Sequence, residues 1–232
     1  MKTPVILANG TFPTHPVALA VLRDAEPLVC CDGAANKLIA FGMTPEVIIG
    51  DLDSIAPEYR FRFSRLLVED GDQETNDLTK AVHWCQCSGI KALTILGATG
   101  GREDHTIANI ALLARYNRDI HADLVSDHGI FRVIRETTRF PSFPGQQISI
   151  FSLTPETAIT AAGLKFPLKE LQLRELWQGS LNEASGDSFS ICFKSGVLLV
   201  YSVHQELRGT VSSENRCIIP ASQAKSGEHG FL

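Results

Sequence analysis

The sequence predicts an α/β protein in which an N-terminal, doubly wound and mostly parallel sheet with helices on both faces is followed by a C-terminal antiparallel β-sandwich. Two observations carry this prediction. Up to about residue 127, short apolar runs alternate with helical stretches, as they do when helical crossovers join parallel strands. Beyond that point, strand-like segments punctuated by Pro, Gly and Ser follow one another without convincing helices between most of them, which is typical of a sandwich.

The N-terminal part contains apolar runs that we interpret as strands and intervening stretches that we interpret as helices. In the fourth helical stretch, apolar residues recur at helical spacing from Leu78 to Cys85, and Gly89 follows as a stop signal. The predicted strands are residues 5–8, 28–31, 47–49, 66–68, 92–96 and 122–125, and the predicted helices are residues 16–24, 34–41, 57–64, 76–88 and 104–117.

The C-terminal part contains predicted strands at residues 130–135, 147–153, 158–161, 188–193 and 197–203. A Lys-Ser-Gly turn at 194–196 predicts a hairpin between the last two. We therefore expect an α/β domain over residues 1–127, a β-sandwich domain over residues 128–211, and a polar, mobile tail over residues 212–232.

Composition and charge argue against several classes of function. The chain has 232 residues, of which 44% are hydrophobic and 20% charged, so it can bury a sizeable core. The net charge of -5 disfavours non-specific nucleic-acid binding, which needs a basic surface. The first apolar run is too short for a signal peptide, and no run approaches the roughly 20 residues of a membrane span. We therefore expect a cytoplasmic protein without nucleic-acid or membrane partners, whose six cysteines stay reduced.

The segment IIGDLDS at 48–54 is the strongest functional signal, because an apolar strand ends at Gly50 and leads directly into Asp51 and Asp53. Side chains alternate along an extended backbone, so these two carboxylates point the same way, roughly 6.5 Å apart at the backbone. Mg²⁺ prefers oxygen ligands and usually takes only one or two from the protein. The alternative is a turn in which Asp51 caps backbone N–H groups and Asp53 is solvated.

Polar loops also follow the neighbouring predicted strands. Ligands of an open parallel sheet bind beyond the carboxyl ends of the strands, where helix N-termini also point. This convergence at one edge of the sheet favours the metal interpretation of Asp51 and Asp53 over the turn. The loops there contain Asn9 and Gly10, Asp32 and Gly33, the acid- and amide-rich residues 73–77, and the glycine-rich residues 97–101 followed by Arg102, Asp104 and His105.

Each of these loops has a structural alternative. Asp77 and Asp104 open predicted helices, where a carboxylate is favoured as an N-cap and by the helix dipole. The glycines at 97–101 form either a turn or a loop that exposes N–H groups to phosphate. His105, taken singly, is more typical of a loop or core histidine than of a catalyst. The sequence contains no G-x-x-x-x-G-K-[ST] motif and is therefore not a P-loop protein.

Taken in order, these motifs resemble those of the thiamine pyrophosphokinase family over about residues 6–203. The resemblance rests on DGAAN at 32–36, GDLDS at 50–54, Asp77 with Lys80, and GGR at 100–102 with Asp104 and His105. In the second half, GLKFPL at 163–168 and SLNE at 180–183 are similar to the family's thiamine-side motifs. Family members commonly have Ser-Asn-Glu uninterrupted where this chain inserts Leu181.

The resemblance implies an enzyme that transfers the pyrophosphoryl group of ATP to the hydroxyl of thiamine, with Mg²⁺ as cofactor and AMP as the second product. It also implies a homodimer in which the ATP site of one subunit faces the thiamine site of the other. The implied metal ligands are Asp51, Asp53 and Asp77, and Asp32 joins them as a catalytic carboxylate. The implied ATP- and phosphate-binding residues are Asn9, Gly10, Asp32, Gly33, Lys80, Gly100, Gly101, Arg102, Asp104 and His105, and the implied thiamine-binding residues are Gln73, Ser180 and Asn182.

Two other functions fit part of the sequence. Asp51 and Asp53 also satisfy the Asp-x-Asp motif of metal-dependent nucleotide-sugar transferases, although that function leaves the other acidic loops unexplained. A non-catalytic module that senses Mg-ATP would use the same loops, but it would not need so many intact carboxylates.

Overall fold

The computed structural model describes residues 2–205, so the tail expected at 212–232 lies outside the described residues. The elements of its first half follow the predicted alternation to within a few residues. The strands are β1 (Thr3–Leu7), β2 (Ala25–Cys31), β3 (Val47–Gly50), β4 (Leu67–Glu69), β5 (Ala92–Leu96) and β6 (His121–Val125), and the helices are α1 (Pro16–Arg23), α2 (Ala34–Ala40), α3 (Pro57–Arg62), the 3₁₀ turn η1 (Ser64–Leu66), α4 (Asp77–Cys87) and α5 (Glu103–Tyr116).

The second half contains the predicted strands and three that the sequence did not reveal. The unpredicted strands are short or polar: β8 contains a proline, β11 is mostly charged and polar, and β12 has two residues. Strands at sheet edges often have such sequences. The elements are β7 (Gly129–Ile134), β8 (Thr138–Pro141), β9 (Gln147–Ser152), β10 (Ala158–Ala162), β11 (Leu168–Gln172), the 3₁₀ turn η2 (Leu176–Gly179), β12 (Asn182–Glu183), β13 (Ser188–Cys192) and β14 (Leu198–Val203).

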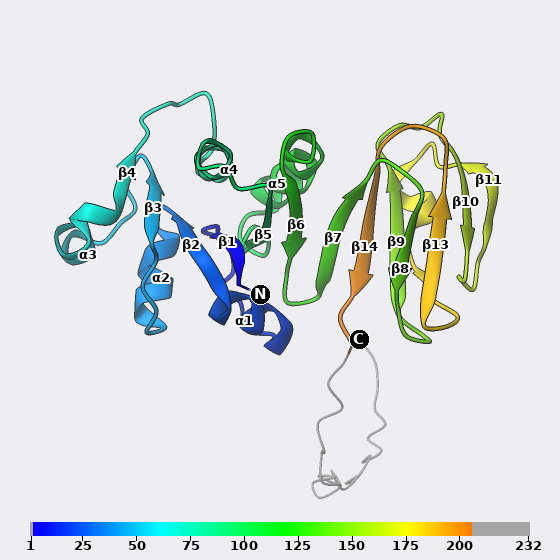
Figure 1. Ribbon diagram of the computed structural model, residues 1–232, viewed down its shortest axis with the longest axis horizontal. Coiled ribbons are helices and arrows are strands. Elements are labelled where there is room, and N and C mark those ends of the chain that lie inside the picture. Colours follow the sequence, from blue (N-terminus) through cyan, green and yellow to red (C-terminus); the bar gives the residue numbers. More distant parts are fainter. Residues whose placement is uncertain (1, 206–232) are drawn as a thin grey trace, which may run out of the picture.

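The strands form two sheets, which confirm the predicted fold class (Figure 1). Within residues 2–205, sheet A has ten strands in the order β12-β9-β14-β7-β6-β5-β1-β2-β3-β4, and sheet B has four in the order β11-β10-β13-β8. The six strands of the first half, in the sheet order β6-β5-β1-β2-β3-β4, are parallel to one another. β7 pairs antiparallel with β6 and continues sheet A into the second half. The antiparallel part of sheet A packs on sheet B around a core that includes Ile148, Val200, Ile159 and Phe189.

The hairpin predicted at 194–196 is wrong. β13 pairs with β10 and β8 in sheet B, whereas β14 pairs with β7 and β9 in sheet A. The turn therefore carries the chain from one sheet to the other. Five residues connect Cys192 to Leu198, and at about 3.3 Å each they easily cross the roughly 10 Å between packed sheets.

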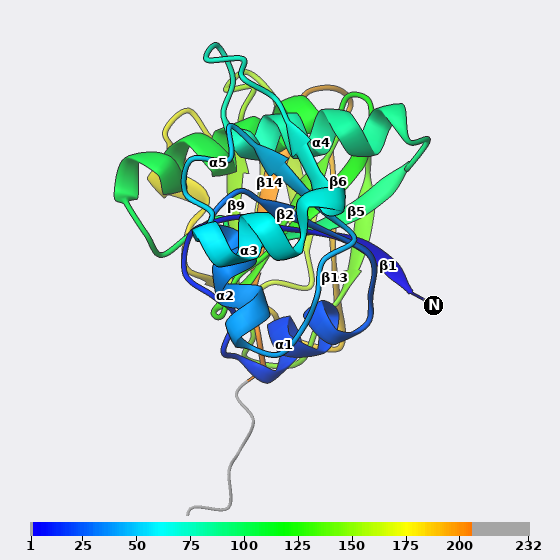
Figure 2. The ribbon, with the colours of Figure 1, turned by 90° about the vertical axis from the view of Figure 1, so that its left-hand side faces the viewer.

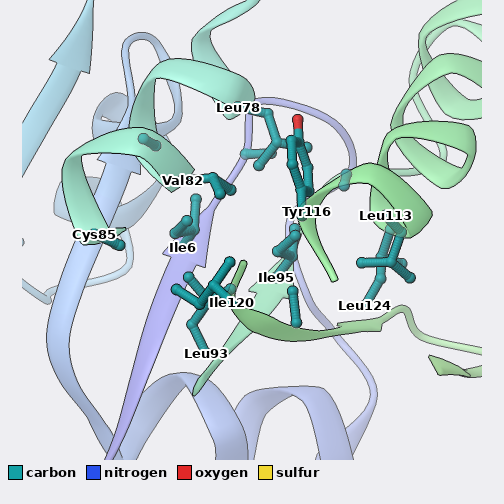
Figure 3. Close-up of a cluster of buried hydrophobic side chains, with 14 of the residues drawn as sticks. Ile6, Leu78, Val82, Cys85, Leu93, Ile95, Leu113, Tyr116, Ile120 and Leu124 are labelled. Atoms are coloured by element: carbon teal, nitrogen blue, oxygen red, sulfur yellow. The ribbon is translucent and has the colours of Figure 1, made fainter. Parts of the chain in front are cut away.

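Helices cover both faces of the parallel part of sheet A (Figure 2). α1 and α2 bury Leu22 and Leu38 against one face. On the other face, α4 and α5 bury Val82 and Tyr116, among other side chains, over β1 and β5 (Figure 3). The strand order reverses at β1, which lies between β2 and β5. A reversal of this kind opens a crevice at the carboxyl ends of the strands, which is where the polar loops lie.

Two further findings concern the described residues. No helix between residues 2 and 205 is long and apolar enough to cross a membrane. Cys30, Cys31, Cys85, Cys87 and Cys192 are free thiols, while Cys217 lies outside the described residues.

Candidate metal and nucleotide site

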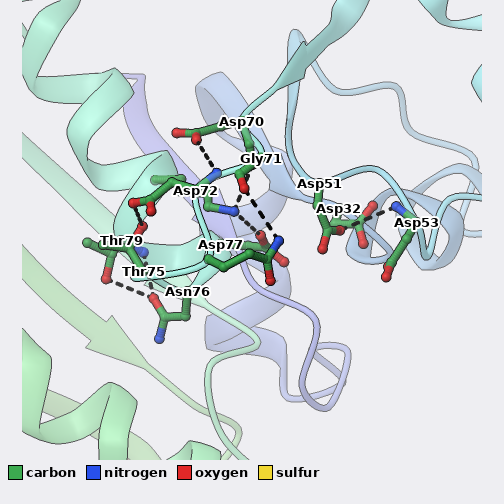
Figure 4. Close-up of polar contacts among 12 residues, drawn as sticks. Asp32, Asp51, Asp53, Asp70, Gly71, Asp72, Thr75, Asn76, Asp77 and Thr79 are labelled. Carbon is green, nitrogen blue, oxygen red and sulfur yellow. Dashed lines mark hydrogen bonds and ion pairs between the residues drawn. The ribbon is translucent and has the colours of Figure 1, made fainter.

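Three carboxylates meet at the carboxyl ends of β2 and β3. Asp32, Asp51 and Asp53 each offer an oxygen within 4.8 Å of the others (Figure 4). The cause is the strand register, because β2 and β3 are parallel neighbours with Cys31 opposite Ile49, and the residues that follow each strand emerge at the same edge. The expected convergence of these carboxylates is therefore present in a single chain.

Asp77, the first residue of α4, lies beside this group. Gly50 makes the approach possible, because a Cβ atom at this position would lie 2.8 Å from the Cβ of Asp32 and 3.2 Å from Oδ1 of Asp77. Burial, the largest cause, raises the pKa of both Asp32 and Asp77, and the charge of Asp51 raises the pKa of each further. Four carboxylates held this close repel one another, and a bound cation would relieve that repulsion.

Asp32 supplies the observation that best fits a metal. It is only 3% exposed, and its Oδ2 accepts a hydrogen bond from the Ser54 N–H at 3.1 Å. Its Oδ1 is buried without a hydrogen-bond partner among the described residues, although buried polar atoms are nearly always paired. A carboxylate oxygen is a preferred ligand of a hard divalent cation. The residues present therefore fit Mg²⁺.

The loop over residues 51–56, called here the 51–56 loop, has an unusual backbone conformation that is held from several sides. Leu52 has φ of 64° and Asp32, facing the loop, has φ of 36°, a region that costs about 1–2 kcal/mol for residues other than glycine. The Leu52 side chain is buried in the core that α1 and α2 cover, and its carbonyl accepts a hydrogen bond from Arg60 at 3.1 Å. These contacts keep the loop in its strained form.

A cavity of about 500 Å³ adjoins the carboxylates, a size that suits a small ligand. Ala8, Cys31 and Ala98 provide apolar lining. The predicted site residues that line it are Asn9, Gly10, Asp77, Gly101, Arg102 and His105.

The loops after β1 and β5 are hydrogen-bonded to each other beside this cavity. The N–H groups of Gly10 and Thr11 donate to the carbonyls of Gly97 and Thr99 at 2.7 and 2.9 Å. The Thr11 hydroxyl donates to the Gly100 carbonyl at 2.6 Å. A Cβ on Gly10 would collide with the carbonyl oxygen of Gly97, so only glycine allows this approach.

Arg102 and Asp104 form an exposed ion pair at the entrance to α5, with Arg102 Nη2 2.6 Å from Asp104 Oδ2. The hydrogen bond from Arg102 is the main reason that the pKa of Asp104 falls to about 2, and the His105 N–H contributes as well. Asp104 therefore stays ionised and orients a guanidinium that lines the cavity, an arrangement suited to binding phosphate oxygens.

The Lys80 side chain is buried beside Asp77. Its side chain is only 3% exposed, its ammonium group lies 3.5 Å from Oδ1 of Asp77, and it donates to the Asp70 carbonyl at 2.8 Å. It does not line the 500 Å³ cavity but a neighbouring one with Asp70 and Asp72. In this arrangement Lys80 acts on the position and charge of Asp77.

Lys37 is a residue of this site that sequence reasoning missed. From α2, its ammonium group donates to the carbonyls of Asn9 and Gly10 at 3.2 and 2.7 Å. Burial lowers the pKa of Lys37. Its only sequence signal is a basic residue one helical turn beyond Gly33, and that signal carries no information about a loop 27 residues away.

The predicted residues of the second half lie far from the carboxylates. Seven strands separate β12, which carries Asn182, from β3 in the order of sheet A as described. Eight strand spacings of about 4.8 Å amount to about 38 Å across the sheet. Gln73, in contrast, lies in the exposed segment that precedes α4, where its amide donates to the Gly71 carbonyl at 3.4 Å. One chain therefore does not bring Ser180 and Asn182 to the carboxylates.

Asn182 is buried, and its side chain holds the backbone of Phe166. Its Oδ1 accepts the Phe166 N–H at 3.1 Å, and its Nδ2 donates to the Phe166 carbonyl at 2.7 Å. The ring of Phe166 is 60% exposed. The Ser180 hydroxyl donates to the Trp177 carbonyl at 2.6 Å. Phe166 is therefore a further candidate for contact with a ligand or another molecule, and the GLKFPL segment is the sequence signal that contains it.

Two family models match the chain in succession. The model described as "Thiamin pyrophosphokinase, catalytic domain" matches residues 19–124, and the model described as "Thiamin pyrophosphokinase, substrate-binding domain" matches residues 129–201. The chain is 32% identical to thiamine pyrophosphokinase 2 of Oryza sativa subsp. japonica over 204 residues, which cover 75% of each chain.

Solved structures of similar proteins share the fold. The thiamine pyrophosphokinase of Bacillus subtilis matches with a TM-score of 0.74 and 24% identity, covering 87% of this chain and 99% of that one. The yeast thiamin pyrophosphokinase matches with a TM-score of 0.72 and 19% identity, covering 88% and 87%.

Proposed function

The chain belongs to the thiamine pyrophosphokinase family, and on this premise we propose that it is an ATP:thiamine diphosphotransferase that converts thiamine and Mg-ATP into thiamine diphosphate and AMP. The observation that carries the metal part of the proposal is the unpaired, buried Oδ1 of Asp32 within a group of three carboxylates. The cavity beside that group, lined by Gly101 and Arg102, supports nucleotide binding there.

In the proposed reaction, the hydroxyl oxygen of thiamine attacks the β-phosphorus of ATP in line. The bond between that phosphorus and the oxygen shared with the α-phosphate breaks, and AMP leaves with the oxygen. Mg²⁺ held by Asp51, Asp53 and Asp77, with Asp32 beside them, would neutralise the charge of the transferred group. Arg102 and the N–H groups of Gly100 and Gly101 would bind phosphate oxygens.

Besides holding the metal, the acidic group is proposed to accept a proton and to attract the thiamine cation. One of the four carboxylates would accept the proton of the thiamine hydroxyl as its oxygen attacks. Lys80 holds Asp77 in place. The negative potential of the group attracts thiamine, which is a cation.

We also propose that two copies of the chain share each active site. The 180–183 segment and Phe166 lie about 38 Å from the carboxylates across sheet A, and a second copy in a symmetric dimer would bring them to the opposing cleft. In this proposal residues 1–127 bind Mg-ATP, residues 128–211 provide the thiamine side and the dimer contact, and the free thiols among the described residues suit a cytoplasmic enzyme.

The products of the reaction test this proposal. Purified protein with Mg-ATP and thiamine is expected to yield AMP and thiamine diphosphate in equal amounts, and both products should disappear when thiamine is omitted or a chelator is added. ADP with thiamine monophosphate would show attack at the γ-phosphorus and contradict the proposed geometry. ATP consumption that does not respond to thiamine would contradict the substrate.

A further inference from the structure

Asn36, in α2, contacts the 51–56 loop with both ends of its side-chain amide. Its Nδ2 donates to the Ser54 carbonyl at 2.8 Å, and its Oδ1 accepts the Ala56 N–H at 3.0 Å. These backbone groups flank Ile55, whose side chain is 5% exposed. The Asn36 amide therefore binds the part of the loop that directly follows Asp51 and Asp53.

Ser54 is the residue at which the restraints on the carboxylates meet. Its N–H donates to Oδ2 of Asp32 at 3.1 Å, and its hydroxyl donates to Oδ1 of Asp53 at 2.7 Å. Asn36 holds the carbonyl of the same residue. The position of Ser54 thus determines how Asp32 and Asp53 face each other.

Helix α2 provides a fixed base for this contact. Asp32 precedes the N-cap residue Gly33, and its carbonyl accepts the Ala35 N–H at 3.1 Å. Ala34, Ala35 and Leu38 are fully buried, which fixes the helix on the sheet. Asp32 and Asn36 therefore belong to one rigid unit. This unit holds Ser54 through the hydrogen bond that Asn36 donates to the Ser54 carbonyl and the one that Asp32 accepts from the Ser54 N–H.

We propose that Asn36 is a positioning residue of the metal site, which holds Ser54 so that Asp51 and Asp53 stay within reach of Asp32. The proposal rests on the metal assignment made under the proposed function. Groups that orient metal ligands typically change metal affinity by about 10- to 100-fold when they are removed. The 51–56 loop keeps its anchor at Leu52 and its bond to Arg60 without Asn36, so the loss should loosen the carboxylates without unfolding the loop.

Asn117 offers a matched control at the far end of α5. Its Nδ2 donates to the carbonyls of Leu113 and Ala122, and its Oδ1 accepts the Ala122 N–H. It is partly buried like Asn36 and also ties a helix to a neighbouring segment, but within residues 2–205 none of its side-chain hydrogen bonds reaches the carboxylate group. Replacement of either residue by alanine removes the same kind of hydrogen bond.

The experiment measures Mn²⁺ binding to the purified, nucleotide-free protein by calorimetry, with Tm recorded for every variant. Asn36→Ala is expected to bind Mn²⁺ at least about tenfold more weakly than the unchanged protein, whereas Asn117→Ala should bind it normally with a similar loss of Tm. In turnover assays, Asn36→Ala should raise the half-saturating Mg²⁺ concentration by more than it lowers kcat at saturating Mg²⁺.

Asn36→Asp keeps the size of the side chain and separates positioning from simple charge. An added negative charge should tighten cation binding if the residue only fills space. The positioning role predicts weaker binding, because the variant cannot donate to the Ser54 carbonyl and places a carboxylate oxygen against it. This variant also decides the question if Asn36→Ala does not fold.

The outcomes distinguish a failure of the role proposed for Asn36 from a failure of the proposed metal site. Normal or tighter Mn²⁺ binding by folded Asn36 variants would overturn the role of Asn36 and leave the metal site intact. Failure of the unchanged protein to bind Mn²⁺ would overturn the metal site itself, and with it the need for a positioning residue.

Discussion

Leu52 and Leu181 have almost the same backbone conformation and opposite surroundings. Their φ angles are 64° and 58°, a conformation that costs a leucine about 1–2 kcal/mol. Leu52 is 2% exposed, and burying such a side chain contributes about 1.5–3 kcal/mol. Leu181 is 76% exposed, so burial of its side chain does not offset the strain, and its N–H donates to the Ser149 hydroxyl at 3.2 Å. Leu52 closes a loop that is packed within the chain, whereas Leu181 lies on an exposed surface.

The same contrast extends to the segments around the two leucines. Asn36, Arg60 and Asp32 hold the 51–56 loop from within the chain. Around the 180–183 segment, Trp177 and Phe166 are 72% and 60% exposed. Large apolar side chains gathered at one surface usually mark a contact with another molecule. In the proposed site, the metal half is held by contacts within one chain, whereas the half around the 180–183 segment exposes large apolar side chains that fit the proposed contact with a second copy.

The largest expected effect is at the metal half. Asp51→Asn should lower turnover by at least about 10³-fold, because it removes a charge from the proposed metal site. Tm should change little, since Asp51 lies at a strand end and is not part of the core. A steady-state assay and a circular dichroism melt measure both quantities. Asp119→Asn, an exposed carboxylate outside the group of three, is the control and should remain fully active. Near-normal turnover of Asp51→Asn at limiting Mg²⁺ would contradict the proposal that this half of the site binds the metal.

The next effect concerns pH. The raised pKa values of Asp32 and Asp77 mean that protons compete with metal at a higher pH than at an ordinary carboxylate. Mn²⁺ affinity should therefore fall as the pH is lowered from neutral towards the ordinary carboxylate range, and binding should release protons that calorimetry in two buffers detects. Without metal, lowering the pH has the opposite effect on folding stability. Both groups hold protons more tightly in the folded state, so they favour the folded state at low pH, and this contribution is lost as pH rises through their folded pKa. Affinity that is constant over this range would contradict the crowding of these carboxylates.

The smallest expected effect is at Leu181. Leu181→Gly should change the free energy of unfolding by no more than about 1 kcal/mol, because relief of strain is partly offset by the greater freedom of the unfolded chain. The matched change Leu52→Gly should destabilise the protein by about 2–5 kcal/mol through loss of burial. Urea titrations measure both. A large loss of stability at Leu181 under conditions where the protein is a monomer would show that this residue has an internal structural role.

Sequence alone predicted the parts of the site that depend on strand ends. Asp32, Asp51 and Asp53 were predicted to converge because parallel neighbours deliver their following residues to one edge. Asn36 and Lys37 were missed as contact residues because they bind backbone groups of loops 18–28 residues away, and such contacts leave no pattern in the sequence. The hairpin at 194–196 was wrong for a related reason, since a turn signal does not say in which sheet the next strand pairs.

Complementation between two inactive variants tests the central claim most directly, namely that the metal half of one chain works with the 180–183 segment of another. Asp53→Asn disables the first half, and Asn182→Ala releases the Phe166 backbone in the second. After co-refolding, half of the dimers should be mixed, and each mixed dimer should contain one intact cleft and one that carries both defects. The account predicts recovery of roughly a quarter of normal activity. Verified mixed dimers that remain inactive would contradict it and place each active site within a single chain.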